Sequence, residues 1–262
     1  MLSKAEIGRL QSLRRRKIRT ETGLFVAEGV RVVEDLIAST IVLDRAFISP
    51  SLEDTERGAR LARELRTRVQ TMDVTDRELG TIAGTDQPQG VVVVASIPRA
   101  TLAAVAALLP ATAHAAVVVL DAVQDPGNFG TVVRCADAFN ALFVVVLPGT
   151  VDPWNPKAVR AAAGSSLRLP IVEATLDELL AFARTHDMQL WGADMEGDDV
   201  AAITPPARTA LVLGNEGAGL SADVRAACDR FVAIPIRGGA ESLNVGVAAG
   251  ILLYSLGREP SA

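Results

Sequence analysis

A glycine-rich segment near the middle of the chain, DPGNFGTVVR (125–134), contains the first candidate for chemistry. Arg134 carries a planar fork of donors that suits a phosphate or a carboxylate, and Gly130, four residues earlier, leaves one side of the helix unshielded. Asn128 follows a tight turn and is expected to cap the helix that contains Arg134. The sequence leaves open whether Arg134 binds a ligand or forms an ordinary salt bridge on its helix.

A second segment, LGNEGAG (213–219), offers its backbone rather than its side chains. Gly214 and Gly217 are small enough for amides and carbonyls to face a ligand directly. The segment lacks the spacing of a dinucleotide fingerprint, and it has no Lys followed by Ser or Thr as in a phosphate loop. A nucleoside triphosphate is therefore not expected. Glu216 is either solvated or pinned by a cleft, and spacing alone does not decide between these alternatives.

The third segment, IPIRGGAESLNVGVAAG (234–250), passes from a strand through a glycine-rich loop into a helix rich in small residues. Ser242 and Asn244 flank the predicted start of this helix, where hydroxyl and amide groups normally satisfy free backbone amides. Helix capping accounts for only one of these two residues. The Gly and Ala residues of the helix allow another backbone to approach closely, either at a buried helix contact or at a symmetric dimer interface.

The hydrophobic runs that precede these segments predict the elements that position them. Six strands are expected in the second half of the chain, with helices between most of them, at 116–120, 142–147, 167–173, 189–194, 210–214 and 231–236. Near-continuous Val, Leu and Ile runs that alternate with amphipathic helices indicate a parallel sheet covered on both faces. Ligands bind such sheets at the carboxyl ends of the strands, so the three segments are expected to converge on one cleft.

The chain is long enough for two domains, and its 49% hydrophobic residues can supply a core for each. Residues 1–97 alternate short strands and helices, which predicts a compact, smaller α/β domain. An Ala-rich connector over 98–115 leads to the parallel-sheet domain at 116–262.

Positive charge is concentrated near one end of a chain whose formal net charge is -5. The run RLQSLRRRKIR (9–19) contains no acidic residue, and it predicts either a solvated helix face or a surface that meets phosphate. Its candidates for RNA contact are Arg14, Arg15, Arg16, Lys17 and Arg19.

Taken in order, NFGTVVR (128–134), LGNEG (213–217) and IPI with ESLNVGVAAG (234–250) resemble the three signature motifs of the SpoU, or TrmH-like, RNA 2'-O-ribose methyltransferases of the SPOUT superfamily. The resemblance extends to FVAEGVRVVEDL (25–36) and QGVVVVA (89–95), which are similar to the family's L30e-like substrate-binding domain. It implies a sheet whose carboxy-terminal chain forms a deep trefoil knot, S-adenosylmethionine as the cofactor and a homodimer packed through the knot.

The resemblance also implies roles for single residues. The reaction centre would be lined by Asn128, Arg134, Glu216, Ser242 and Asn244. The cofactor would be held by Leu213, Gly214, Glu216, Gly217, Ile234, Ile236, Ser242 and Leu243. An N-terminal domain of this kind favours large-subunit (23S) ribosomal RNA over tRNA as the substrate.

Other classes of function fit the sequence less well. No metal-ligand cluster or Ser, His, Asp arrangement is visible, and Cys135 and Cys228 show no disulfide spacing. No stretch approaches the roughly 18 apolar residues of a membrane span, so a soluble, cytoplasmic protein is expected. A tRNA methyltransferase and a non-catalytic protein for ribosome assembly remain the alternatives, although all the motif positions are filled. A nucleotide-dependent metabolic enzyme would need a fingerprint that the chain lacks.

Overall fold

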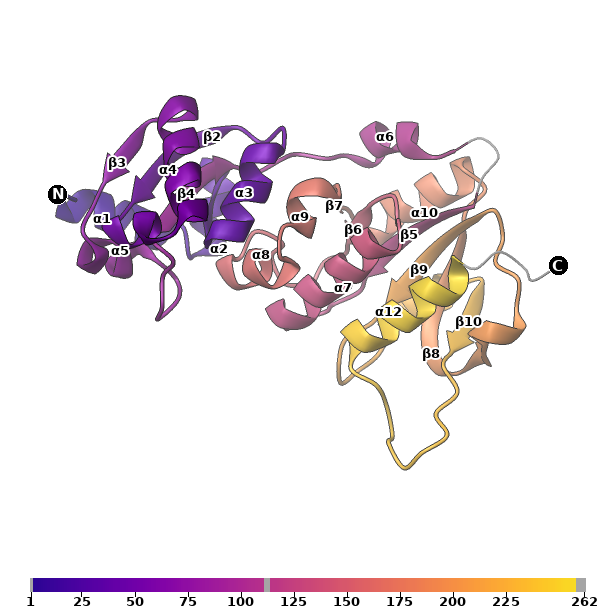
Figure 1. Ribbon diagram of the computed structural model, residues 1–262. Helices are drawn as coiled ribbons and strands as arrows, with labels where there is room; N and C mark the ends of the chain where they lie inside the picture. Colours follow the sequence, from indigo (N-terminus) through magenta and orange to yellow (C-terminus); the bar gives the residue numbers. More distant parts are fainter. Residues whose placement is uncertain (1, 111–113, 258–262) are drawn as a thin grey trace. The chain divides into compact units, whose positions relative to one another are not determined.

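The computed structural model describes residues 2–110 and 114–257 (Figure 1). Its contacts divide the chain into two compact units: unit 1 is Met1–Pro98 with Asp152–Arg168, and unit 2 is Arg99–Val151 with Leu169–Ala262. The predicted domain boundaries rest on sequence pattern and remain a prediction. The segment Asp152–Arg168, which lies within the second domain of that prediction, makes its contacts in unit 1.

Unit 1 is built on a four-stranded sheet of order β1-β4-β2-β3. The pairs β1/β4 and β4/β2 are antiparallel, and β2/β3 is parallel. The strands are β1 (Leu24–Glu28), β2 (Leu43–Ile48), β3 (Thr71–Asp73) and β4 (Val91–Ser96). The helices are α1 (Lys4–Ser12), α2 (Arg16–Thr22), α3 (Val30–Ala38), the 3-10 turn η1 (Pro50–Asp54), α4 (Glu56–Arg68), α5 (Asp76–Ile82), α8 (Pro156–Ala162) and α9 (Ser165–Arg168).

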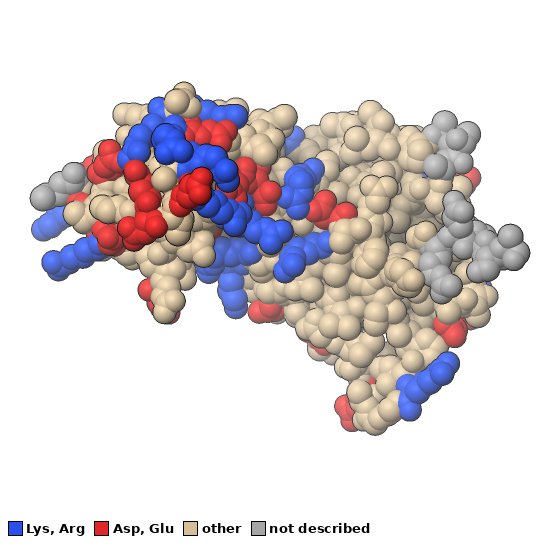
Figure 2. Space-filling model, viewed as in Figure 1, with Lys and Arg blue, Asp and Glu red and all other residues tan. Residues whose placement is uncertain are grey.

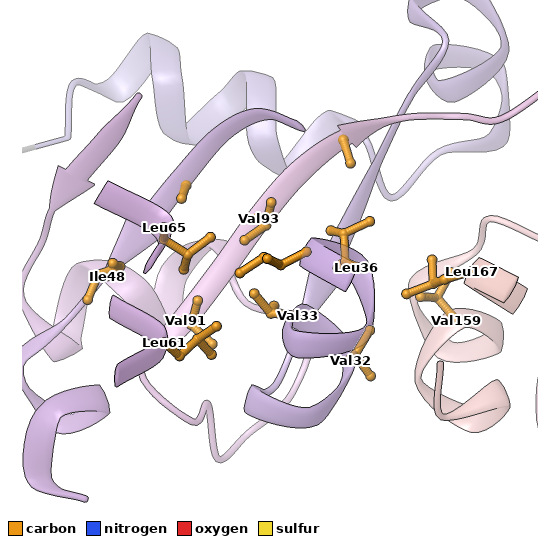
Figure 3. Packing of buried hydrophobic residues seen from close by; sticks show 14 of the residues in the cluster. Val32, Val33, Leu36, Ile48, Leu61, Leu65, Val91, Val93, Val159 and Leu167 are labelled. Carbon is orange, nitrogen blue, oxygen red and sulfur yellow. The ribbon is translucent and has the colours of Figure 1, made fainter. Parts of the chain in front are cut away.

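Both faces of this sheet are covered, as the run of valines in β4 requires. Successive side chains of a strand point to opposite faces, so Val91 and Val93 enter one hydrophobic cluster while Val92 and Val94 enter another. Figure 3 shows the first cluster, in which helices α3 and α4 pack against β4. Val159 and Leu167, from α8 and α9, belong to the same cluster.

Polar and aromatic contacts also fix the segment Asp152–Arg168 in unit 1. The guanidinium of Arg19 donates to the carboxylate of Asp152 from Nε at 2.9 Å and from Nη2. The rings of Phe25 and Trp154 have centroids 4.8 Å apart. Through these contacts the carboxylate of Asp152 and the ring of Trp154 are both buried in unit 1.

Unit 2 contains a six-stranded sheet of order β10-β8-β9-β5-β6-β7 in which every pair is parallel. This confirms the predicted parallel α/β architecture; the knot itself remains a prediction. The strands are β5 (Ala115–Leu120), β6 (Val144–Val146), β7 (Ile171–Glu173), β8 (Gln189–Asp199), β9 (Arg208–Leu213) and β10 (Arg230–Ala233). The helices are α6 (Leu102–Val105), η2 (Ala106–Leu108), α7 (Pro126–Ala138), α10 (Leu176–Thr185), η3 (Val200–Ala202), α11 (Ala222–Ala227) and α12 (Val245–Leu256).

Three predicted strands are shorter than the sequence suggested, and one of them, expected over 142–147, is β6 (Val144–Val146). The strand expected over 167–173 is β7 alone, because α9 ends at Arg168 and Pro170 follows. The strand expected over 231–236 ends at Ala233, ahead of Pro235. Proline has no amide hydrogen to donate to a ladder, so at both prolines the apolar run is longer than the strand.

The order of the strands marks a switch point in unit 2. From β5 the chain moves to β6 and β7 on one side, whereas β9 lies on the other side of β5. Ligand crevices of open parallel sheets lie outside the carboxyl ends of the strands at such a point. The first motif lies in α7, the helix that follows β5, and the second motif starts at the last residue of β9.

Candidate active site

The carboxylate of Glu216 is the centre of a hydrogen-bond network at the switch point. Its Oε1 accepts from the amide of Asp125 at 3.1 Å and from Nδ2 of Asn128 at 2.9 Å, and its Oε2 accepts from the amide of Gln124 at 3.2 Å. Burial raises the pKa of this carboxyl, but the hydrogen bonds from Asn128 and from backbone amides outweigh that effect and hold the pKa below its ordinary value. Glu216 is therefore an ionised residue pinned by the cleft, which decides the alternative that the sequence left open.

Asn128 joins all three motifs, although it is not the helix cap that the sequence predicted. Helix α7 begins at Pro126, and the cap is Asp125, whose carboxylate accepts from the amide of Asn128 at 2.9 Å. Proline fits the first helical position because its fixed φ suits the helix and its missing amide hydrogen costs nothing there. The side chain of Asn128 is thus free to donate to Glu216 and to accept from Nδ2 of Asn244 at 2.7 Å.

Asn244 caps helix α12, as expected for one of the two polar residues at this position. Its Oδ1 accepts from the amides of Gly246 and Val247 at 2.9 and 3.3 Å. The helix lies against α7 (Figure 1), and a Cβ added to Gly246 would lie 2.6 Å from Cγ2 of Thr131. The small residues of α12 therefore serve a buried helix contact within this chain.

The turn after β9 is as tight as its glycines suggested. Asn215 and Gly219 exchange backbone hydrogen bonds of 2.9 and 3.0 Å, and a Cβ on Gly214 would lie 2.4 Å from the carbonyl carbon of Gly219. Glycine is required at position 214 because backbone atoms occupy the space of a side chain. Gly217 is exposed, with only Oδ1 of Asn215 near a Cβ added there.

The other residues predicted to hold the cofactor lie mainly on the loop between β10 and α12. This loop projects from the body of unit 2 (Figure 1), and Ile236 and Leu243 are large apolar side chains exposed on it. Ile234 is half-buried, and Ser242 is exposed, with no hydrogen bond to the rest of the described chain. The side chain of Leu213, by contrast, is buried in the core, and its carbonyl accepts from the amide of Asp121 at 2.9 Å.

Arg134 lies on α7, one turn beyond Gly130, and its side chain is exposed. Within residues 2–110 and 114–257 its guanidinium has no ion pair or hydrogen bond, so the helix salt bridge considered from the sequence is absent there. Its donors are available to a ligand.

Comparison with known proteins agrees with this arrangement. The family model described as SpoU rRNA Methylase family matches residues 115–254, which is more than half of the chain. This chain belongs to that family. A second model, the MRM3-like substrate binding domain, matches residues 4–93. The resemblance inferred from the motifs is thereby confirmed.

Relatives of this SpoU-family chain include two proteins with named RNA targets. A 23S rRNA (guanosine(2553)-2'-O)-methyltransferase of Bacillus subtilis is 32% identical over 94% of this chain and 93% of its own length. A 23S rRNA (uridine(2479)-2'-O)-methyltransferase of Streptomyces viridochromogenes is 32% identical over 93% of this chain and 86% of its own length. Both relatives methylate ribose in the large-subunit RNA, at different nucleosides.

Two solved structures of the family resemble the whole chain. The SpoU methyltransferase AviRb from Streptomyces viridochromogenes, in complex with the cofactor AdoMet, has a TM-score of 0.87 at 29% identity and covers 97% of each chain. An AdoMet-bound rRNA methyltransferase from Sinorhizobium meliloti has a TM-score of 0.85 at 28% identity and covers 98% of this chain and 95% of its own. S-adenosylmethionine is the cofactor of these neighbours, as the motif resemblance implied for this SpoU-family protein.

The basic run of this SpoU-family protein is only partly exposed. Arg14, Arg15, Arg16 and Lys17 are exposed, but Arg19 is 2% exposed and is held by Asp152 and by the carbonyl of Leu13. The prediction that Arg19 contacts RNA is therefore wrong, because a buried carboxylate and a backbone carbonyl occupy its donors.

Three residues that position the site were missed from the sequence. Asp125 caps α7, Asn215 donates to the carbonyl of Ala122 at 2.8 Å, and Asp121 accepts from the amide of Ser221 at 2.6 Å. An Asp followed by Pro is a recognisable helix start, so the first could have been found. The other two contacts join residues about 100 positions apart, and no local pattern signals them.

Residues 2–110 and 114–257 offer neither a metal-binding cluster nor a membrane-spanning helix. This part of the chain has no group of three or more His, Cys, Asp or Glu side chains that could hold a metal ion. None of its helices is long and apolar enough to cross a membrane.

Proposed function

We propose that this protein transfers the methyl group of S-adenosylmethionine to a ribose 2'-hydroxyl in 23S rRNA, in the cytoplasm. The observation that carries the proposal is the chain of hydrogen bonds from Glu216 through Asn128 to Asn244, which joins the three family motifs at the switch point of the sheet. The named targets of the two relatives favour large-subunit RNA over tRNA. Their different nucleosides leave the modified position of this protein open.

The residues of the second and third motifs suit the cofactor. The exposed apolar side chains of Ile236 and Leu243 offer surface to an adenosine group. The backbone at Gly217 is open, whereas Gly214, which is packed against Gly219 on its Cβ side, can offer only its amide and carbonyl. When bound, S-adenosylmethionine supplies a methyl group on a sulfonium, which is already a good donor. The protein's main task is then to align a weakly acidic hydroxyl with that donor.

Arg134 is the residue that we assign to the substrate. A guanidinium stays protonated in proteins, so it does not act as a base. We infer that it holds an RNA phosphate next to the target ribose and stabilises the alkoxide that develops there, while a phosphate or a water takes the proton. Arg134→Lys should keep part of the activity if charge alone suffices, and lose nearly all of it if the two-pronged geometry is needed.

Helix α12 also supports a homodimer. Helix α12 exposes the side chains of Val247, Ile251 and Tyr254, and the ring of Tyr254 lies 5.9 Å from that of Phe139, the residue that follows α7. Figure 2 shows few charged side chains on the face of unit 2 that carries α12. A contiguous apolar patch of this kind is typical of an interface. We propose that two copies of the chain pack through it and that the predicted knot lies in the same region.

The dimer is tested by the molar mass of the protein in solution, measured by light scattering after gel filtration. Wild type should give the mass of two chains, and Ile251→Asp should give the mass of one while retaining its circular dichroism spectrum. A monomeric wild type would reject this part of the proposal.

The activity is tested by transfer of labelled methyl from S-adenosylmethionine to protein-free rRNA and, separately, to tRNA. We expect label in rRNA with wild type and loss of label with Arg134→Ala. Label in tRNA alone would favour the tRNA alternative. No label in either RNA, in spite of demonstrated cofactor binding, would favour an assembled ribosomal particle as substrate, or the non-catalytic role in ribosome assembly.

A further inference from the structure

A pocket of about 210 Å³ opens on unit 1, apart from the motifs described above. Its walls come from the β1–α3 turn, from the loop before β4 and from α8. The lining residues that matter for binding are Glu28, Arg31, Thr85, Gln89 and Arg160.

An ion pair orients one wall of the pocket. Glu28 is only 4% exposed, and its carboxylate accepts from the amide of Gly84 at 2.7 Å and from Nη1 of Arg160. The guanidinium of Arg160 makes no other hydrogen bond in the part of the chain that the structure describes, although it lines the pocket. Glu28 is thus a positioning residue that holds Arg160 by one amino group and leaves the remaining donors of its fork available.

Two further donors face the same pocket. Oε1 of Gln89 accepts from the amide of Val30 at 2.9 Å, so the oxygen of this side chain points to the backbone and its NH₂ group is left as a donor. Arg31 is exposed and lines the pocket, with no ion pair to another described residue. The guanidinium groups of Arg31 and Arg160 against the single carboxylate of Glu28 leave one net positive charge, which suits one phosphate.

A second hollow lies next to this pocket and reaches the basic run. This hollow, of about 430 Å³, is lined by Arg14 and by residues of the 80–86 segment. Thr85 lines both hollows, and the guanidinium of Arg14 donates to the carbonyl of Ala83. Asp86 also lines the second hollow, and its negative charge makes the first pocket the better place for a phosphate.

We propose that these two hollows form one groove for the sugar-phosphate backbone of single-stranded RNA. In the first pocket a phosphate is bound by Arg31, Arg160 and the side-chain NH₂ group of Gln89. This inference rests on the proposed function, and it moves the main phosphate contact from the basic run to the pocket. Guanidinium groups bind phosphate with two parallel hydrogen bonds. Contacts of this kind set the position and register of a nucleic acid without reading its sequence.

The test measures binding of a short fluorescein-labelled oligouridylate by fluorescence anisotropy over a range of KCl concentrations. Arg31→Met removes one phosphate contact and should lower the slope of log Kd against log salt by about 0.7. Gln89→Glu keeps the acceptor for Val30 but places a negative charge in the pocket, and it should weaken binding at least about tenfold. Arg63→Met, which removes an exposed arginine of α4 that does not line the pocket, is the matched control and should bind like wild type.

Arg160 is tested in a background that avoids an unpaired buried carboxylate. The double variant Glu28→Gln with Arg160→Met should fold, and it should lose RNA affinity and salt dependence as Arg31→Met does. Thermal unfolding of every variant separates lost binding from lost structure. Wild-type affinity and slope in Arg31→Met and Gln89→Glu would overturn the proposal.

Methyl transfer to rRNA, measured on the same wild-type sample, distinguishes this inference from the proposed function. Methylation by wild type together with unchanged RNA binding by the pocket variants rejects the groove alone. Weakened binding by the variants without any methylation by wild type rejects the proposed function and leaves the groove standing.

Discussion

Replacing Glu216 by glutamine should loosen the link between the first two motifs while keeping the size of the side chain. Oε1 of Glu216 accepts from the amide of Asp125 and from Nδ2 of Asn128, and Oε2 accepts from the amide of Gln124. The single side-chain oxygen of glutamine can still accept from the amide of Asp125 and from Nδ2 of Asn128. Its NH₂ group then faces the amide hydrogen of Gln124, and two donors repel each other.

The loss of unfolding free energy follows from the number of hydrogen bonds that each substitution removes. A hydrogen bond to a charged group stabilises a protein by about 1.5–3 kcal/mol, and the exposure of Glu216 reduces this to about 1 kcal/mol for each bond through competition with water. Glu216→Gln, which loses one bond and the charge that strengthens the others, should cost about 1–2 kcal/mol. Glu216→Ala, which loses these three bonds and a longer one of 3.5 Å from Nδ2 of Asn215, should cost about 3 kcal/mol.

Urea unfolding followed by tryptophan fluorescence measures these costs, since Trp191 is buried in unit 2. Methyl transfer should fall in the same order, because the side chain of Asn128 loses the carboxylate that orients it. Asp177→Asn is the control: it removes an exposed carboxylate from the same unit, and it should change stability by less than about 0.5 kcal/mol. The reasoning is refuted if Glu216→Ala is as stable and as active as this control.

Three further outcomes follow from the structure. Gly214→Ala should destabilise unit 2 by at least about 1–3 kcal/mol, because the new Cβ would lie 2.4 Å from the backbone of Gly219; a urea midpoint equal to that of wild type would contradict this. Arg19→Met leaves Asp152 buried and unpaired, so thermal unfolding should reveal a loss of about 3–5 kcal/mol, whereas a role in RNA binding alone would leave the melting temperature unchanged. Acid should weaken the Glu216 network: the folded pKa of this carboxyl lies below its ordinary value of 4.5, so its stabilisation is complete above that pH and is lost as the pH falls through the folded pKa. The difference in unfolding free energy between wild type and Glu216→Gln should therefore narrow below pH 4.5, and a difference that widens there would show the opposite sign.

The sequence predicts the architecture of unit 2 well because its evidence is local. Runs such as the valines of β5 and the small residues of α12 determine burial and element type without reference to distant residues. The ends of elements are less well predicted. The apolar run around Pro235 continues past the end of β10, since apolar residues can be buried or bind a ligand without pairing in a sheet.

The roles of individual polar residues depend on contacts that sequence does not contain. Arg19 resembles its basic neighbours in type and position, yet a carboxylate 133 residues away binds it. Asn128 is a good cap by composition, yet Asp125 takes that role and frees the asparagine for Glu216 and Asn244. The partner of Arg19 is distant in the sequence, and the better helix cap lies three residues before Asn128.

The third motif has a part that is fixed by hydrogen bonds and a part that is exposed. Asn244 is fixed by Asn128 and by the amides that it caps, so the start of α12 is held in place relative to the first two motifs. The loop before it instead exposes Ile236 and Leu243. Burial of these apolar side chains under a ligand stabilises the complex with that ligand. We propose that a cofactor held by this loop is coupled to Asn128 through Asn244, because Asn244 ends the loop and donates to Oδ1 of Asn128, beside the place assigned to the substrate.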